Sequence, residues 1–269
     1  MSQVPVDRLH VLVKPEHAET LPAALSTLGP YTLRNSTTSF DVSYDNSLGT
    51  TGQNLADAVL GRCEQDLQQL TTWFGGVAAG RFALFIDPGS FGAYHASCAA
   101  TELHLAAFDG SNGDLVNMLN VAEVDEVFMA VQNAGWDCGA SHGEGLSRVL
   151  SAERYPAQLD GFASASAWLD TSNRPDWVSN TEATDRNYVS IGCAALFINY
   201  LHYQLDYSLT AIVAAAAPTL AQVYTNLTSR TDAFAAFSAL VEQRFPIGAP
   251  SGLTDDNPFP IPPSATTAA

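Results

Sequence analysis

The sequence has few basic residues, with 11 lysines and arginines against 28 aspartates and glutamates, and its formal net charge is −17. A surface this acidic repels phosphate backbones, so we expect no nucleic-acid partner. The sequence also lacks a run of 18 apolar residues, so we expect no membrane-spanning helix. Its first residues show no basic region followed by a long apolar one, so we expect no signal peptide and a soluble protein.

Several catalytic motifs are absent as well. There is no G-x-S-x-G elbow, no G-x-x-x-x-G-K-[ST] phosphate loop and no dinucleotide fingerprint. The four cysteines, at 63, 98, 138 and 193, form no C-x-x-C pair, which disfavours a thiolate zinc site. Cys138 lies four residues before His142, but a Gly-rich loop between them gives no basis for a catalytic cysteine–histidine pair.

The apolar content of 46% is enough to build a core, and the order of the expected elements favours an α+β fold. Alternation and short apolar runs predict strands at 9–13, within 31–45, at 82–87 and at 101–108. Helical periodicity predicts helices at 16–28, 54–74, 188–205, 208–216, 220–228 and 234–245. The tail from residue 246 contains six prolines, and we expect it to be extended or disordered.

The stretch 117–150 predicts two helices joined by a Gly-rich elbow. In the first helix, apolar residues recur at three- and four-residue spacing. Glu123 and Glu126 are three residues apart on a different face of that helix, and Glu144 lies in the first turn of the second. Two neighbouring helices, predicted at 115–132 and 143–154, therefore carry three carboxylates.

This stretch resembles the zinc-binding core of the gluzincins, the zincin branch that includes thermolysin-like and aminopeptidase-type metallopeptidases. That family carries H-E-x-x-H on one helix and a glutamate in an N-E-G-L-A-like context on the next. Here residues 143–147, Gly-Glu-Gly-Leu-Ser, match the second motif, and residues 122–126, Ala-Glu-Val-Asp-Glu, are a degenerate form of the first. Residues 188–201 resemble a later helix of such peptidases, and the resemblance spans roughly 55–245.

The resemblance implies a zincin-like α+β fold with a cleft between two lobes. The first lobe, 1–114, would be a small mixed sheet whose strand at 101–108 runs along the cleft. The second lobe, 115–245, would be mostly helical and would carry the degenerate site. Residues 246–269 would form the Pro-rich extended tail.

The resemblance also implies roles for individual residues. Glu123 would be the catalytic base, Glu144 the glutamate of the second motif, and Tyr188 stands where some gluzincins carry a tyrosine that stabilises the oxyanion. The two histidine positions of the motif are Ala122 and Glu126. Because alanine has no ligand atom, the nitrogen-rich zinc site is not available, and we expect no cofactor and no stoichiometric zinc.

The carboxylates leave further alternatives open. The oxygen atoms of Glu126 and Glu144, with His142 beside them, are suited to a divalent cation such as Ca²⁺, Mg²⁺ or Mn²⁺. His95 and His104 are other histidines that could contribute to such a site. Alternatively, a carboxyl with a raised pKa beside an ionised one could perform acid–base chemistry without a metal.

A purely structural interpretation of the same residues is also open. Some of the carboxylates, Asp125 included, could point to water or pair with Arg148 or Arg154. Two of the four cysteines, Cys98 and Cys138, flank the candidate site. The four cysteines could form up to two disulfides or remain buried thiols, and the 98–138 pair is the first to test.

Three functional hypotheses follow. The first is a metallopeptidase-like hydrolase scaffold with a decayed zinc motif and a peptide-sized cleft. Its activity on a peptide or small polymeric substrate would be weak, altered or lost, and any activity would use Glu123. The second is a non-catalytic protein that binds a peptide or glycan in the same cleft. The third is a metal-independent hydrolase that uses paired carboxylates.

Overall fold

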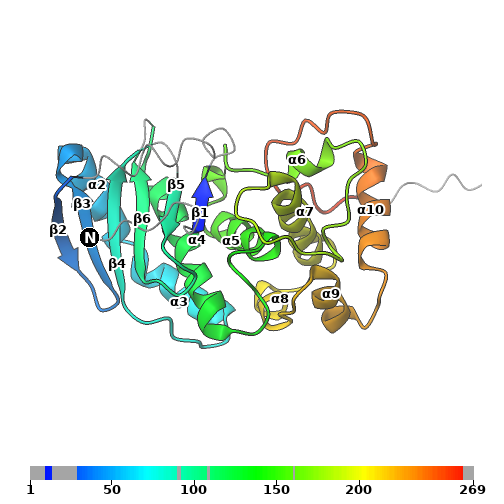
Figure 1. Cartoon of the computed structure of the whole chain (residues 1–269), viewed down its shortest axis with the longest axis horizontal. Helices are drawn as coiled ribbons and strands as arrows, with labels where there is room; N and C mark the ends of the chain where they lie inside the picture. The colour runs from blue at the N-terminus through cyan, green and yellow to red at the C-terminus, as the bar shows by residue number, and fades with distance from the viewer. Residues whose placement is uncertain (1–9, 14–28, 90–91, 108–109, 160, 263–269) are drawn as a thin grey trace, which may run out of the picture.

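The computed structural model describes residues 10–13, 29–89, 92–107, 110–159 and 161–262 (Figure 1). The helix expected at 16–28 lies outside these residues. Within them, six strands form one mixed sheet in the order β1-β5-β6-β4-β3-β2. The strands are β1 (His10–Val13), β2 (Tyr31–Ser36), β3 (Phe40–Asp45), β4 (Phe82–Pro88), β5 (Gly92–His95) and β6 (Glu102–Ala107).

The sheet is parallel at its centre and antiparallel at both sides. β3, β4 and β6 run parallel to one another, whereas β2 pairs antiparallel with β3, β5 with β6, and β1 with β5. The central strands are buried: Leu84 and Ile86 of β4 and Leu103 and Leu105 of β6 are fully inaccessible to solvent. Buried parallel strands of this kind require a helix layer over the sheet.

The helices fall into two groups, which Figure 1 shows beside the sheet and to its right. The first group comprises α2 (Gly49–Leu60), α3 (Cys63–Trp73) and α4 (Gly113–Gln132), with the short turn η4 (Asn46–Leu48) before α2. The second comprises α5 (Ser141–Arg154), η5 (Pro156–Gln158), α6 (Ala165–Leu169), α7 (Tyr188–Asn199), η6 (Tyr200–Gln204), α8 (Leu209–Ala214), α9 (Leu220–Thr228) and α10 (Ala233–Arg244).

Helix α4 connects the two parts of the molecule. It packs against β5 and β6 on one side and against α5 on the other. The side chain of Asn112 accepts a hydrogen bond from the Leu115 amide at 2.9 Å and caps the start of the helix, and Asn133 ends it in the left-handed region with φ 46°. Every residue from Leu115 to Met129 is buried, as expected for a helix that is surrounded by protein.

The structure confirms the α+β layout and the two neighbouring helices predicted at 115–132 and 143–154, which are α4 and α5. It also confirms the strand at 101–108 as β6. A zincin-like topology and a cleft between the lobes stay predictions. Among the described residues, no helix has both the length and the apolar character that crossing a membrane requires.

Two local expectations were wrong. The helix predicted at 54–74 is two helices, because the chain turns at Gly61 and Arg62, where Arg62 has φ −129°. Residues 92–95, for which the sequence predicted no strand, form β5. Because β5 and β1 pair outside β6, the strand predicted at 101–108 is an interior strand of the sheet.

The C-terminal tail is extended, as predicted, but its described part, 246–262, is docked on the helical part of the protein. The carboxylate of Asp256 accepts hydrogen bonds from the amides of Ser164 at 2.7 Å and Ala165 at 2.6 Å. Phe259 and Ile261 are buried. The proline-rich composition therefore prevents regular structure here without preventing tertiary contacts.

The approach of α5 to α7 generates a testable prediction at Gly145. A Cβ atom at this position would lie 2.7 Å from Ala194 Cβ and 2.8 Å from Ala195 N, both on α7. We expect Gly145→Ala to lower the free energy of unfolding by roughly 1–3 kcal/mol, although alanine forms helices better than glycine by about 1 kcal/mol. Denaturant unfolding measures this difference.

Gly61 provides the matched control. A Cβ atom there would meet only carbonyl oxygens at 3.5 Å, and its φ of −71° suits any residue. We expect Gly61→Ala to change stability by less than about 1 kcal/mol. A Gly145→Ala protein as stable as the Gly61→Ala protein would contradict the packing described for α5 and α7.

Candidate functional site

The carboxylates of α4 and α5 lie in the interior of the protein. Glu123, Asp125, Glu126 and Glu144 are each at most 1% exposed. An ionised carboxylate loses its hydration when it is buried, so such a group must be paired, share a proton or bind a cation. Four of them near one helix–helix interface therefore define the candidate site.

Small residues on α5 allow it to pack closely against the elbow and against α4. A Cβ atom on Gly143 would lie 1.9 Å from the carbonyl oxygen of Asp137, so only glycine fits at this point of the elbow. The hydroxyl of Ser147 donates a hydrogen bond to the carbonyl oxygen of Ala122 at 3.0 Å and joins α5 to α4. Close packing thus explains Gly143 and Ser147 of the Gly-Glu-Gly-Leu-Ser segment independently of its resemblance to the gluzincin motif.

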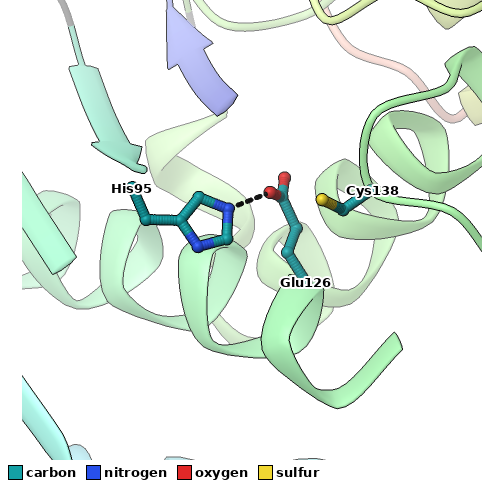
Figure 2. Close-up of side chains that lie close together, drawn as sticks. All are labelled: His95, Glu126 and Cys138. Atoms are coloured by element: carbon teal, nitrogen blue, oxygen red, sulfur yellow. Dashed lines mark hydrogen bonds and ion pairs between the residues drawn. The ribbon is translucent and has the colours of Figure 1, made fainter. Parts of the chain in front are cut away.

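Strand β5 contributes a histidine to the site (Figure 2). The Nε2 atom of His95 lies 2.8 Å from Oε2 of Glu126, and both side chains are at most 1% exposed. The other ring nitrogen, Nδ1, lies 3.4 Å from the carbonyl oxygen of Ala100. The sequence identified His95 and Glu126 separately, and the strand that brings them together, β5, was not predicted.

A disulfide closes the same region. Cys98, just after β5, is bonded to Cys138 in the elbow before α5, whereas Cys63 and Cys193 are free and buried. Figure 2 shows Cys138 on the side of Glu126 away from His95. One ligand atom from each of His95, Glu126 and Cys138 lies within 4.8 Å of the others.

Glu144 has the environment of a carboxyl that keeps its proton. Burial raises its pKa well above the usual range, and the charges of Glu126, Asp185 and Glu123 add to the rise, while that of Arg148 opposes it. Neither carboxyl oxygen of Glu144 has a hydrogen-bond partner within the described part of the chain. Glu123, Glu126 and Glu144 therefore form one group of electrostatically interacting carboxyls.

The environment of Asp125 acts in the same direction. Burial raises its pKa well above the usual range, the charge of Glu126 raises it further, and the hydroxyl of Ser147 opposes the change. The site therefore holds two carboxyls, Asp125 and Glu144, for which the protonated form is favoured.

Arg148 and Tyr188 border Glu144. The guanidinium carbon of Arg148 lies 5.4 Å from the centre of the Tyr188 ring, and one of its Nη atoms donates a hydrogen bond to the carbonyl oxygen of Phe162. Burial raises the pKa of Tyr188 to about 12; the Arg148 charge opposes this rise, and that of Glu144 adds to it. The predicted site residues Glu123, Glu144 and Tyr188 thus lie in one electrostatic neighbourhood, with Tyr188 a neutral phenol.

His142 and His104, which the sequence also offered as ligands, have other partners. The Nε2 atom of His142 is 3.0 Å from the carbonyl oxygen of Gly135, and its ring stacks on Trp136 at 5.6 Å. Burial lowers the pKa of His142, so its neutral form is favoured. His104 pairs with Asp87 of β4 at 2.8 Å and stacks on Tyr94.

The zinc ion that the gluzincin resemblance implies does not fit these residues. Ala122 offers no ligand atom, and Oε2 of Glu126 is already within 2.8 Å of His95. Across the described residues, one cluster has the spacing of a metal site, and it contains Glu126 with His95 and Cys138, without Glu144 or His142. The predicted ligand set Glu126, Glu144 and His142 shares only Glu126 with this cluster.

Comparison with known proteins adds no family assignment. No family model matches the chain, and neither a curated protein nor a solved structure matches it. The gluzincin resemblance consequently rests on the motif residues alone and stays a prediction.

The raised pKa of Glu144 predicts a specific pH dependence of stability. An unfolded glutamate has a pKa of about 4.3, so above that value the folded chain holds a proton that the unfolded chain has released. Stability is then lost as the pH rises toward the folded pKa. Glu144→Gln removes this loss. As the pH rises, the free energy of unfolding of the variant should therefore increase relative to that of the wild type, by up to about 1.4 kcal/mol per pH unit.

Urea unfolding from about pH 4 to about pH 8 measures this difference. Glu242 of α10 is exposed and is the matched control, because Glu242→Gln removes no buried carboxyl. A difference between Glu144→Gln and the wild type that does not change with pH would show that Glu144 is not held protonated.

Proposed function

We propose that this chain is a metallopeptidase-like hydrolase scaffold whose zinc motif has decayed, and that any hydrolysis it performs uses the carboxyls of Glu123 and Glu144. The proposal is supported by the burial of these two carboxyls, one on α4 and one on α5, and by the effect of the Glu123 charge on the pKa of Glu144. Acid–base chemistry needs one group that gives a proton and one that takes it.

The environments of the cluster support different roles for its members. Glu144, favoured in its protonated form, is suited to donate a proton to a leaving group. Glu123 would take the proton of the attacking water. Tyr188, a neutral phenol beside Arg148, is suited to donate a hydrogen bond to the oxygen on which negative charge develops.

Two features limit the rate that such a site can reach. Without a bound cation to acidify the attacking water, a carboxylate is a weak base for it. In addition, Glu123 and Glu144 are inaccessible to solvent, so a substrate reaches them only after the protein opens locally. We therefore propose weak or altered activity, on peptides or other small polymers.

A second candidate function, non-catalytic peptide binding, is favoured by strand β1. This short strand pairs antiparallel with β5, with His10 opposite His95, and it contacts α4. Addition of an extended segment to a strand edge is a common mode of peptide recognition. A peptide that replaced β1 on β5 would lie next to the carboxylate cluster without being cleaved.

A substrate screen with matched variants tests the proposed function. The chain is assayed on pooled peptide, ester and glycoside substrates, and any activity is measured again in Glu123→Gln and Glu144→Gln. We expect each substitution to lower kcat/KM at least about a hundredfold, the smaller end of what a positioned acid or base contributes. Glu242 is exposed on α10, and Glu242→Gln should leave kcat/KM unchanged.

The outcomes separate the hypotheses. Activity that survives unchanged in Glu123→Gln would place the chemistry elsewhere in the chain. If no substrate in the screen is cleaved but a labelled peptide binds and is retained intact, non-catalytic peptide binding replaces the hydrolase proposal.

A further inference from the structure

The cluster of His95, Glu126 and Cys138 has features that the proposed hydrolysis does not use. The three side chains come from β5, from α4 and from the elbow before α5 (Figure 2). All three are at most 1% exposed, and one ligand atom from each lies within 4.8 Å of the others. Imidazole, carboxylate and thiolate are the three ligand types that zinc takes from proteins.

The histidine is already oriented as a metal ligand. Its Nδ1 atom faces the carbonyl oxygen of Ala100 at 3.4 Å, so Nδ1 carries hydrogen and Nε2 is directed toward Glu126. Metal-binding histidines usually donate their second N–H to a carbonyl or carboxylate in this way. Between Nε2 and Oε2 of Glu126, 2.8 Å apart, there is one position for a proton or for a cation.

Glu126 has one oxygen left over. Its Oε1 atom is buried and has no hydrogen-bond partner in the part of the chain that the structure describes. A buried carboxylate oxygen normally has a partner, so Oε1 of Glu126 is available to bind a ligand. Tetrahedral zinc places its ligand atoms roughly 3.3–3.7 Å apart, so movements of about 1 Å would close the cluster around an ion.

Cys138 cannot act as a thiolate ligand while its sulfur is bonded to Cys98. A dithiol reductant changes this: the S–S bond breaks, the reductant becomes a disulfide, and Cys98 and Cys138 each gain a hydrogen as thiols. Zinc that then binds displaces the Cys138 thiol proton and the proton between His95 and Glu126, and both protons go to solvent. Zinc with one carboxylate and one thiolate is electrically neutral, which suits a buried site.

A reductant and an ion have a route to this position. A surface hollow of about 430 Å³ is lined by both cysteines of the disulfide together with Met129, Asn133 and Trp136. Cys98 is partly exposed, whereas Cys138 is buried. Attack on the sulfur of Cys98 from this hollow would release Cys138 on the interior side, next to Glu126.

We infer that His95, Glu126 and Cys138 bind zinc when the Cys98–Cys138 disulfide is reduced, and that the intact disulfide prevents this binding. Water completes the coordination as the fourth ligand. The site is separate from the proposed acid–base pair because neither Glu123 nor Glu144 is a ligand.

The test compares zinc binding by the oxidised and the reduced full-length chain. Reduction with a phosphine, which is then removed without air, should raise the thiol count of the denatured protein from two to four. After dialysis against zinc, we expect no stoichiometric metal on the oxidised protein and one zinc per chain on the reduced protein by plasma emission analysis. Cobalt in place of zinc should give a thiolate charge-transfer absorption.

Two cysteine variants form a matched pair, because both break the disulfide and any loss of stability is common to them. Cys98→Ser keeps Cys138 as a thiol and should bind one zinc without reductant. Cys138→Ser keeps Cys98 but lacks the ligand, so it should bind zinc more than about tenfold more weakly and give no thiolate absorption with cobalt. His95→Gln and Glu126→Gln should each weaken zinc binding in the reduced protein, and Glu242→Gln should not.

Three results would overturn the inference. One is equal zinc binding by folded Cys98→Ser and Cys138→Ser proteins. Another is one zinc per chain on the oxidised wild type. The third is a reduced wild type that keeps its circular dichroism spectrum and binds no zinc. None of these measurements involves hydrolysis, so failure here is distinguishable from failure of the proposed function.

Discussion

The burial of carboxylates between α4 and α5 is the physical constraint on which the rest of the site depends. A buried negative charge is unfavourable unless something neutralises it, and Glu123, Asp125, Glu126 and Glu144 are all inside the protein. The chain meets this requirement in several ways at once. Glu126 pairs with His95, Glu144 lies near Arg148, and burial favours the protonated forms of Asp125 and Glu144. A cluster that holds protons in this way is a natural place for proton transfer or for the binding of a cation.

The fold positions this cluster through close backbone approaches and few covalent constraints. Gly143 and Gly145 allow α5 to press against the elbow and α7, and the Ser147 hydroxyl joins it to α4. On the other side, β5 brings His95 to α4, and the Cys98–Cys138 disulfide fixes the end of β5 to the elbow. The same disulfide keeps Cys138 from acting as a third ligand beside His95 and Glu126. One covalent bond therefore both stabilises the site and determines which ligands it offers.

Much of the helical framework could be predicted from the sequence, because periodicity reports directly on buried faces. The pair of helices at α4 and α5 and the three glutamates on them followed from residue spacing alone. The four-residue strand β5 could not be predicted, since Gly-Ala-Tyr-His is too short to show alternation. Because β5 was not predicted, neither the interior position of β6 nor the pairing of His95 with Glu126 could be predicted. The contact of His142 with Gly135 could not be predicted either, because it depends on how the elbow folds in three dimensions.

An infrared spectrum at neutral pH tests the central claim most directly, namely that burial beside Glu123 and Glu126 keeps Glu144 protonated. The carbonyl stretch of a protonated carboxylic acid is separate from that of a carboxylate and shifts when the protein is transferred to heavy water. We predict that this band is stronger in the wild type than in Glu144→Gln, and that Glu242→Gln retains the wild-type intensity. Equal bands in the wild type and Glu144→Gln would mean that Glu144 is ionised, and the account of the cluster given above would be contradicted.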